Sequence, residues 1–245
     1  AGTVATMSGQ LAFRLQEPLS ANVYEDIPTR PEELAQSLEY MTTPSPDAAA
    51  YLRLFRGRTV AHKVKASELD QYLEKMHNFE TEHFDDVYLD PGQFSTLISA
   101  FKRMDRVQVL VGHGNFNILS FDDMLKHSAY YESVGAFPRH ESDFLAELFS
   151  ANAHGYGFHG EKVITELTAR VPEADVVKVS LTGHFLYKGD SARLYEKVKT
   201  DVGDIELTSG IRSVVKQTHL FMAKTIQAKG NLYRASRSLA PPGHS

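Results

Sequence analysis

The chain has 245 residues, of which 42% are apolar and 23% are charged, and both values are ordinary for a globular protein with a core. This length allows one large domain or two small ones. No run of about 18 apolar residues occurs, so we expect no membrane span. The net charge of -5 argues against nucleic acid as a partner, because surfaces that bind phosphate are usually basic.

Two further features of the composition limit the chemistry. The chain contains no cysteine, which excludes disulfides and thiolate metal sites. A transition-metal site would therefore use the 11 histidines and the carboxylates. The first residues have neither the charged nor the apolar region of a signal peptide, so we expect none in this chain. This end is either a mature N-terminus left by cleavage or an added stretch before Met7.

The first part of the chain predicts an extended lead-in followed by helices. Residues 1–30 are mixed and contain proline, and a helix start follows at 31–34, where proline and acidic residues suit the first turn. Residues 42–46 contain two prolines and form a candidate linker. Apolar residues then recur at helical spacing over 47–55 and 66–79.

The middle of the chain is also predicted to be mostly helical. Pro91-Gly92 indicates a turn, and the valines at 107, 109 and 111 alternate with other residues as in a strand over 106–111. No catalytic motif occurs in the first 170 residues, which we interpret as one mostly helical region. The predicted helices of this middle part span 93–104, 121–131 and 141–153.

The last third of the chain changes character. A β-branched run at 174–181 and the segment 205–208 predict strands. An amphipathic helix is predicted over 191–202, with Ser191 as its N-cap, and a second one over 213–228, ended by Gly230 in a left-handed cap. Strands that alternate with helices suit an α+β or α/β domain.

The segment Leu207–Ser213 is the sharpest candidate for a binding site. A predicted strand ends there, Gly210 permits a tight turn, and Arg212 is delivered to the start of the next helix. Helix N-termini and arginine side chains both bind anions, and a guanidinium can hold a carboxylate through two parallel bonds. The alternative interpretation is an arginine that pairs with an acidic residue of the protein at a helix start.

The sequence of this segment and its neighbours resembles that of a known protein family. Ser209-Gly210-Ile211-Arg212-Ser213, followed by Gln217, is similar to the Ser-Gly-Tyr-Arg-Ser…Gln motif of the VanY-type D-alanyl-D-alanine carboxypeptidases, with isoleucine in place of the usual tyrosine. Residues 182–186 and the helix after them resemble the first strand and helix of that family. Residues 230–231 and 236–245 resemble the segment that leads to its metal motif. The resemblance covers residues 172–245.

The resemblance implies a fold and an activity. It predicts an α+β fold in which a mostly helical region, 1–170, precedes part of a VanY/hedgehog-like peptidase domain, 172–245. The implied function is zinc-dependent removal of D-alanine from peptidoglycan stem peptides, in the bacterial periplasm or at the cell surface. In the family, a Ser-x-His motif begins the zinc-ligand segment, and a later Glu is the general base. Ser245 matches the first residue of that motif, so no zinc ligand is assigned to this chain, and His244 is interpreted as a surface residue.

The resemblance also assigns roles to individual residues. Arg212 is predicted to be the catalytic residue present here, because it would hold the terminal carboxylate of the peptide or the developing oxyanion. Ser209, Ser213, Gln217 and Ser245 are predicted to join Arg212 in binding the substrate. Zinc is expected as the cofactor of the complete protein.

Two other hypotheses stay open. The chain could be a non-catalytic cell-wall binding or scaffold protein that keeps the substrate-binding half of the site. It could instead be one piece of an enzyme whose partner is a C-terminal fragment of the same protein, which we favour because half a sheet would expose unpaired edges. A glycine-rich stretch also holds His154 and His159, whose spacing differs from the four residues of helical metal motifs, and we interpret it as a loop.

Overall fold

The computed structural model describes residues 68–244. The predicted lead-in, the helix start at 31–34, the linker at 42–46 and the helix at 47–55 lie outside these residues, as does Ser245. In chain order the elements are α4 (Leu69–His77), α5 (Pro91–Val111), α6 (His113–Phe116), α7 (Phe121–Tyr130), α8 (Arg139–Ser150), η3 (Ala153–Tyr156), η4 (Glu173–Asp175), β1 (Val176–Lys178), β2 (Phe185–Tyr187), α9 (Asp190–Val202), α10 (Val214–Gln227) and α11 (Leu232–Ser238).

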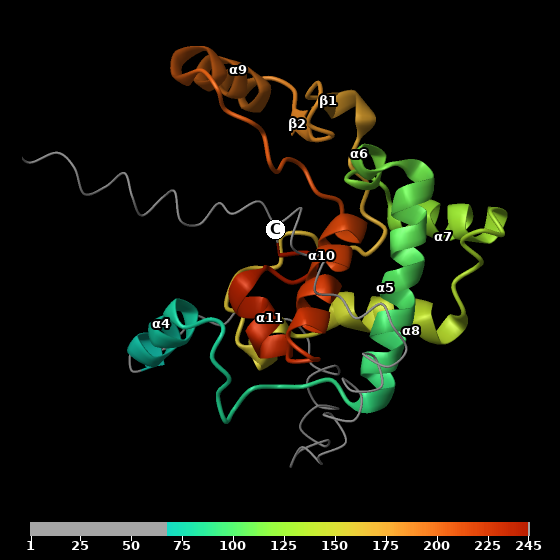
Figure 1. Cartoon of the computed structure of the whole chain (residues 1–245), viewed down its shortest axis with the longest axis vertical. Coiled ribbons are helices and arrows are strands. Elements are labelled where there is room, and N and C mark those ends of the chain that lie inside the picture. The colour runs from blue at the N-terminus through green and yellow to red at the C-terminus, as the bar shows by residue number, and fades with distance from the viewer. Residues whose placement is uncertain (1–67, 245) are drawn as a thin grey trace, which may run out of the picture.

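The helix α5 is the longest described element and lies at the centre of a helical body (Figure 1). It begins sharply because the Asp90 side chain accepts a hydrogen bond from the N–H of Gln93, and the Gln93 side chain accepts one from the N–H of Asp90. Pro91 occupies its first turn, where no N–H is needed. The buried face of α5 packs against α8 and α10.

The strand predicted at 106–111 is wrong, since these residues form the last turns of α5. The alternation of valines does not match the burial: Val107 is buried, whereas Val109 is 69% exposed to solvent. Phe94, Phe101 and Met104 set a helical period of buried residues that continues through Val107. A short β-branched run therefore did not override the longer helical pattern before it.

The helix α10 completes the body. Ser213 caps it, because the hydroxyl oxygen of Ser213 accepts a hydrogen bond from the N–H of Lys216 at 3.2 Å. After the helix, Gly230 has a φ of 86°, as expected of a left-handed cap. The core joins residues of α5 and α8 to residues of α10 and α11. It therefore unites chain segments from both sides of the predicted boundary at 170–172.

A smaller lobe, defined here as residues 176–202, projects from one end of the body (Figure 1). In it β1 and β2 pair antiparallel, with Val176 opposite Tyr187, and α9 packs against β2. The helix prediction is confirmed for α9, but Gly189 and not Ser191 is its N-cap. The strand predicted at 205–208 is wrong: these residues form neither a strand nor a helix in the structure.

The described chain is thus mostly helical with a two-stranded sheet, which agrees with the predicted α+β class at a coarse level. Among the helices of residues 68–244, none is both long and apolar enough to cross a membrane.

Candidate functional site

The turn that carries Arg212 lies where the lobe meets the body. The N–H of Ile211 donates to the carbonyl of Phe185 in β2 at 2.8 Å, and the N–H of Ser213 donates to the carbonyl of Asn117 at 2.7 Å. A Cβ atom at Gly210 would overlap the carbonyl oxygen of Phe185. Glycine is therefore needed here because two backbones touch, which fixes the turn against β2.

The guanidinium of Arg212 is held by neutral partners. Its Nη2 donates to the hydroxyl of Ser209 at 2.8 Å, and its Nη1 donates to the Oε1 of Gln217 at 3.4 Å. No carboxylate within residues 68–244 forms an ion pair with it. Partial burial lowers the pKa of Arg212, but a guanidinium keeps its charge at neutral pH. The alternative of an arginine paired with a protein carboxylate therefore does not apply in the described chain.

Gln217 and Ser213 lie behind the arginine and not at the surface. Both are almost fully buried. Besides meeting Arg212, Gln217 donates through Nε2 to the carbonyl of Ala240 at 2.5 Å, so it joins the arginine to the C-terminal segment. The Ser213 hydroxyl is occupied as the cap of α10. In this arrangement the two residues position Arg212, and Ser209 is the exposed neighbour of the guanidinium. Ser245, the remaining predicted site residue, is not described.

Two further groups make the surroundings of Arg212 positive. Lys216, one turn into α10, donates to the Oε1 of Gln108 at 2.9 Å. Burial, together with the charge of Arg212, lowers the pKa of Lys216 to about 8, although Asp105 acts in the opposite direction. Burial and the charges of Lys216 and Arg212 also lower the pKa of His184, which favours its neutral form. Sequence reasoning missed Lys216, because nothing local distinguishes it from a surface lysine.

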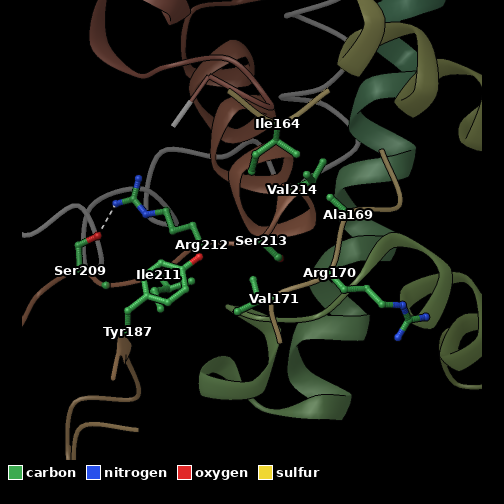
Figure 2. Close-up of a pocket in the computed structure, with 11 residues that line it drawn as sticks. Ile164, Ala169, Arg170, Val171, Tyr187, Ser209, Ile211, Arg212, Ser213 and Val214 are labelled. Atoms are coloured by element: carbon green, nitrogen blue, oxygen red, sulfur yellow. Dashed lines mark hydrogen bonds between the residues drawn. The ribbon is translucent and has the colours of Figure 1, made fainter. Parts of the chain in front are cut away.

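Arg212 borders a pocket of about 410 Å³ (Figure 2). In the close-up, the arginine extends toward Ser209 on one side of the pocket, and the ring of Tyr187 lies beside Ile211. Such a volume falls in the usual range for small-ligand sites, about 300 to 1,000 Å³. The apolar part of the lining comes from two stretches of chain: Ile164, Ala169 and Val171 belong to one, and Ile211 and Val214 belong to the other.

A second arginine borders the same pocket but is already paired. Arg170 points away from Arg212 in Figure 2 and holds the carboxylate of Asp123 through two hydrogen bonds of 2.8 and 3.2 Å. The pKa of Asp123 falls to about 2, through the hydrogen bond from Ser120 first and that from Arg170 second. The charge of Arg170 is thus compensated within the protein, whereas that of Arg212 is not.

The two histidines of the glycine-rich loop come together. The ring centroids of His154 and His159 are 4.3 Å apart, and Tyr72 contacts His159 edge-on at 5.0 Å. In the described part of the chain, however, no group of three or more His, Cys, Asp or Glu side chains could hold a metal ion. The described residues therefore do not fit a zinc site.

No family model, curated protein or solved structure matches this chain.

Proposed function

We propose that this chain carries the carboxylate-binding part of a zinc-dependent D-alanyl-D-alanine carboxypeptidase that acts on peptidoglycan stem peptides. One observation supports the proposal above others: Arg212 is a partly buried cation, held only by neutral side chains, at the edge of a pocket. The motif resemblance at residues 209–217 and the expected location at the bacterial cell surface or periplasm belong to the same proposal.

The guanidinium has the capacity to bind a peptide carboxylate. A guanidinium has five N–H donors, and in the described chain Arg212 uses one on each terminal nitrogen, toward Ser209 and Gln217. The remaining donors suit the two oxygens of a carboxylate. Lys216 and the turn that begins α10 add positive potential, so an anion bound here would offset the unfavourable burial of like charges.

These contacts suggest a separate role for each residue of the site. Arg212 would bind the terminal carboxylate of the peptide, Ser209 and Gln217 would orient the guanidinium, and Ser213 would fix the helix that carries it. Zinc is expected from the family resemblance alone, because the described residues do not fit a zinc site. Hydrolysis is therefore proposed for the complete protein, and binding of the peptide end is proposed for this chain.

Isothermal titration of N-acetyl-D-alanyl-D-alanine into the full chain tests the proposal. Arg212→Ala should weaken binding by 10-fold or more, because a charge-assisted hydrogen bond contributes about 1.5–3 kcal/mol. Arg193→Ala, which removes an exposed arginine of α9, is the matched control and should bind like the wild type. The same peptide with a C-terminal amide should not bind. Equal affinity of wild type and Arg212→Ala, or of acid and amide, would refute the role of Arg212.

The alternative function, a non-catalytic cell-wall binding protein, would use the same carboxylate site. The zinc content and peptidase activity of the complete gene product separate the two: one zinc per molecule with release of D-alanine supports the peptidase. Absence of both, with peptide binding retained, supports the binding protein.

A further inference from the structure

We propose that the segment 164–171 is a specificity wall, which selects the side chain of the residue whose carboxylate Arg212 binds. This inference rests on the proposed function and goes beyond it. The wall lies outside residues 172–245, the part of the chain that resembles the carboxypeptidase family. The pocket would accept C-terminal residues with aliphatic side chains larger than a methyl group.

The wall is apolar on its inner side. Ile164, Ala169 and Val171 line the pocket together with Ile211 and Val214, and Figure 2 shows Ile164 and Val171 on opposite sides of the space. A pocket of about 410 Å³ has room for more than a methyl group. Each methylene moved from water into an apolar site should tighten binding about fourfold, from about 0.8 kcal/mol per methylene.

Two contacts hold the wall in place. At one end the N–H of Ile164 donates to the carbonyl of Gly243 at 2.9 Å, and a Cβ atom at Gly243 would approach the Ile164 carbonyl oxygen to 2.7 Å. At the other end the ion pair of Arg170 with Asp123 ties the segment to α7. These two contacts restrain the segment, and a restrained segment can discriminate between ligands by shape.

The charges of Arg170 and Arg212 determine the orientation of the bound ligand. Arg170 and Arg212 both border the pocket, but only Arg170 has a carboxylate partner in the described chain. The ligand carboxylate therefore goes to Arg212, and the side chain next to it goes toward the apolar space between Ile211 and the wall. The sequence alone could not indicate this, since residues 164–171 carry no motif.

Titration of three peptides tests the wall: N-acetyl-D-alanine joined to glycine, to D-alanine and to D-norvaline. Wild type should bind the three with rising affinity, by about fourfold for each added methylene. Val171→Trp fills the pocket and should weaken binding of the norvaline peptide more than 10-fold, with the glycine peptide within about twofold of wild type. Val163→Trp is the matched control, because Val163 belongs to the same segment, is 66% exposed and does not line the pocket.

Ile164→Ala provides a second test if Val171→Trp does not fold, as judged by circular dichroism. It should remove most of the gain from added methylenes while it leaves the glycine peptide unaffected. If binding depends on Arg212 but neither variant changes the order of the three peptides, the wall is refuted and the proposed function stands. If no peptide binds the wild type, both are refuted.

Discussion

Two helices of similar length, α9 with 13 residues and α10 with 14, show how differently the lobe and the body are stabilised. Both are amphipathic in sequence. Ten residues of α10 are buried, between α5 and α11, whereas none of α9 is buried. The apolar stripe of α9, formed by Leu194, Val198 and Val202, is about half or more exposed at each position. An amphipathic pattern thus predicts a helix, but the tertiary neighbours decide how much stability it contributes.

The largest expected effect is a core truncation in the body compared with the same kind of change in the lobe. Phe221→Ala should lower the free energy of unfolding by about 3–5 kcal/mol, because Phe221 is fully buried and its removal leaves a cavity. Leu194→Ala, on the exposed face of α9, should change it by less than about 0.5 kcal/mol. Urea unfolding of both variants measures this difference, and similar losses would contradict the contrast between the two helices.

The ion pairs of body and lobe differ in the same way as their helices. Asp86 and Arg237 form a pair in which both side chains are almost fully buried, and Asp86 also accepts from the side-chain amide of Asn231. Asp86→Ala should cost about 3–5 kcal/mol, since it leaves a buried guanidinium without its carboxylate. Asp201→Ala removes the exposed partner of Lys197 in α9 and should cost less than about 1 kcal/mol. A small effect of Asp86→Ala in thermal or urea unfolding would show that water reaches this pair.

A substitution at Gly210 is expected to disrupt the contact between lobe and body. Gly210→Ala places a methyl group against the carbonyl oxygen of Phe185, and the turn or β2 must move. We expect a loss of about 1–3 kcal/mol in unfolding free energy, as for other overpacked sites. Two-dimensional NMR should show shifted signals at Phe185 and Ile211 with the body unchanged. Unchanged signals at both residues would mean that the two backbones are not in contact.

A pH dependence of the unfolding free energy is expected from Lys216. Its folded-state pKa of about 8 lies below the ordinary value of 10.5, so between these values the unfolded chain binds more protons. Stability should therefore rise from pH 8 to 10.5 through this group, and be independent of it below about pH 7. The difference in unfolding free energy between wild type and Lys216→Met isolates this contribution from that of other groups. A difference that stays constant from pH 7 to 10 would contradict the depressed pKa.

The sequence predicted the helices well wherever apolar residues recur at helical spacing, as in α5, α7 and α10. It failed at 106–111, where a short valine run lay inside a longer helical period, and at 205–208, where a β-branched segment found no strand to pair with. Local pattern cannot report either outcome, because both depend on neighbours that are distant in the sequence.

The candidate site could be predicted only in part, because some of its contacts are local in the sequence and others are distant. Ser209, Arg212 and Gln217 lie within nine residues of one another, and their contacts could be anticipated from one motif. Lys216 gains its low pKa from burial by other elements, and the wall at 164–171 precedes Arg212 by more than 40 residues. Neither signal exists in the local sequence.

The segment 240–243 has a consequence for the energetics of the site. It accepts a hydrogen bond from Gln217 through the Ala240 carbonyl and another from Ile164 through the Gly243 carbonyl. The support for the arginine and the support for the wall thus share one short stretch of backbone. Whatever restrains that stretch preorganises both ends of the pocket together. Because a coupling free energy is the same in both directions, a peptide that fills the pocket stabilises the restrained form of this stretch by the same amount.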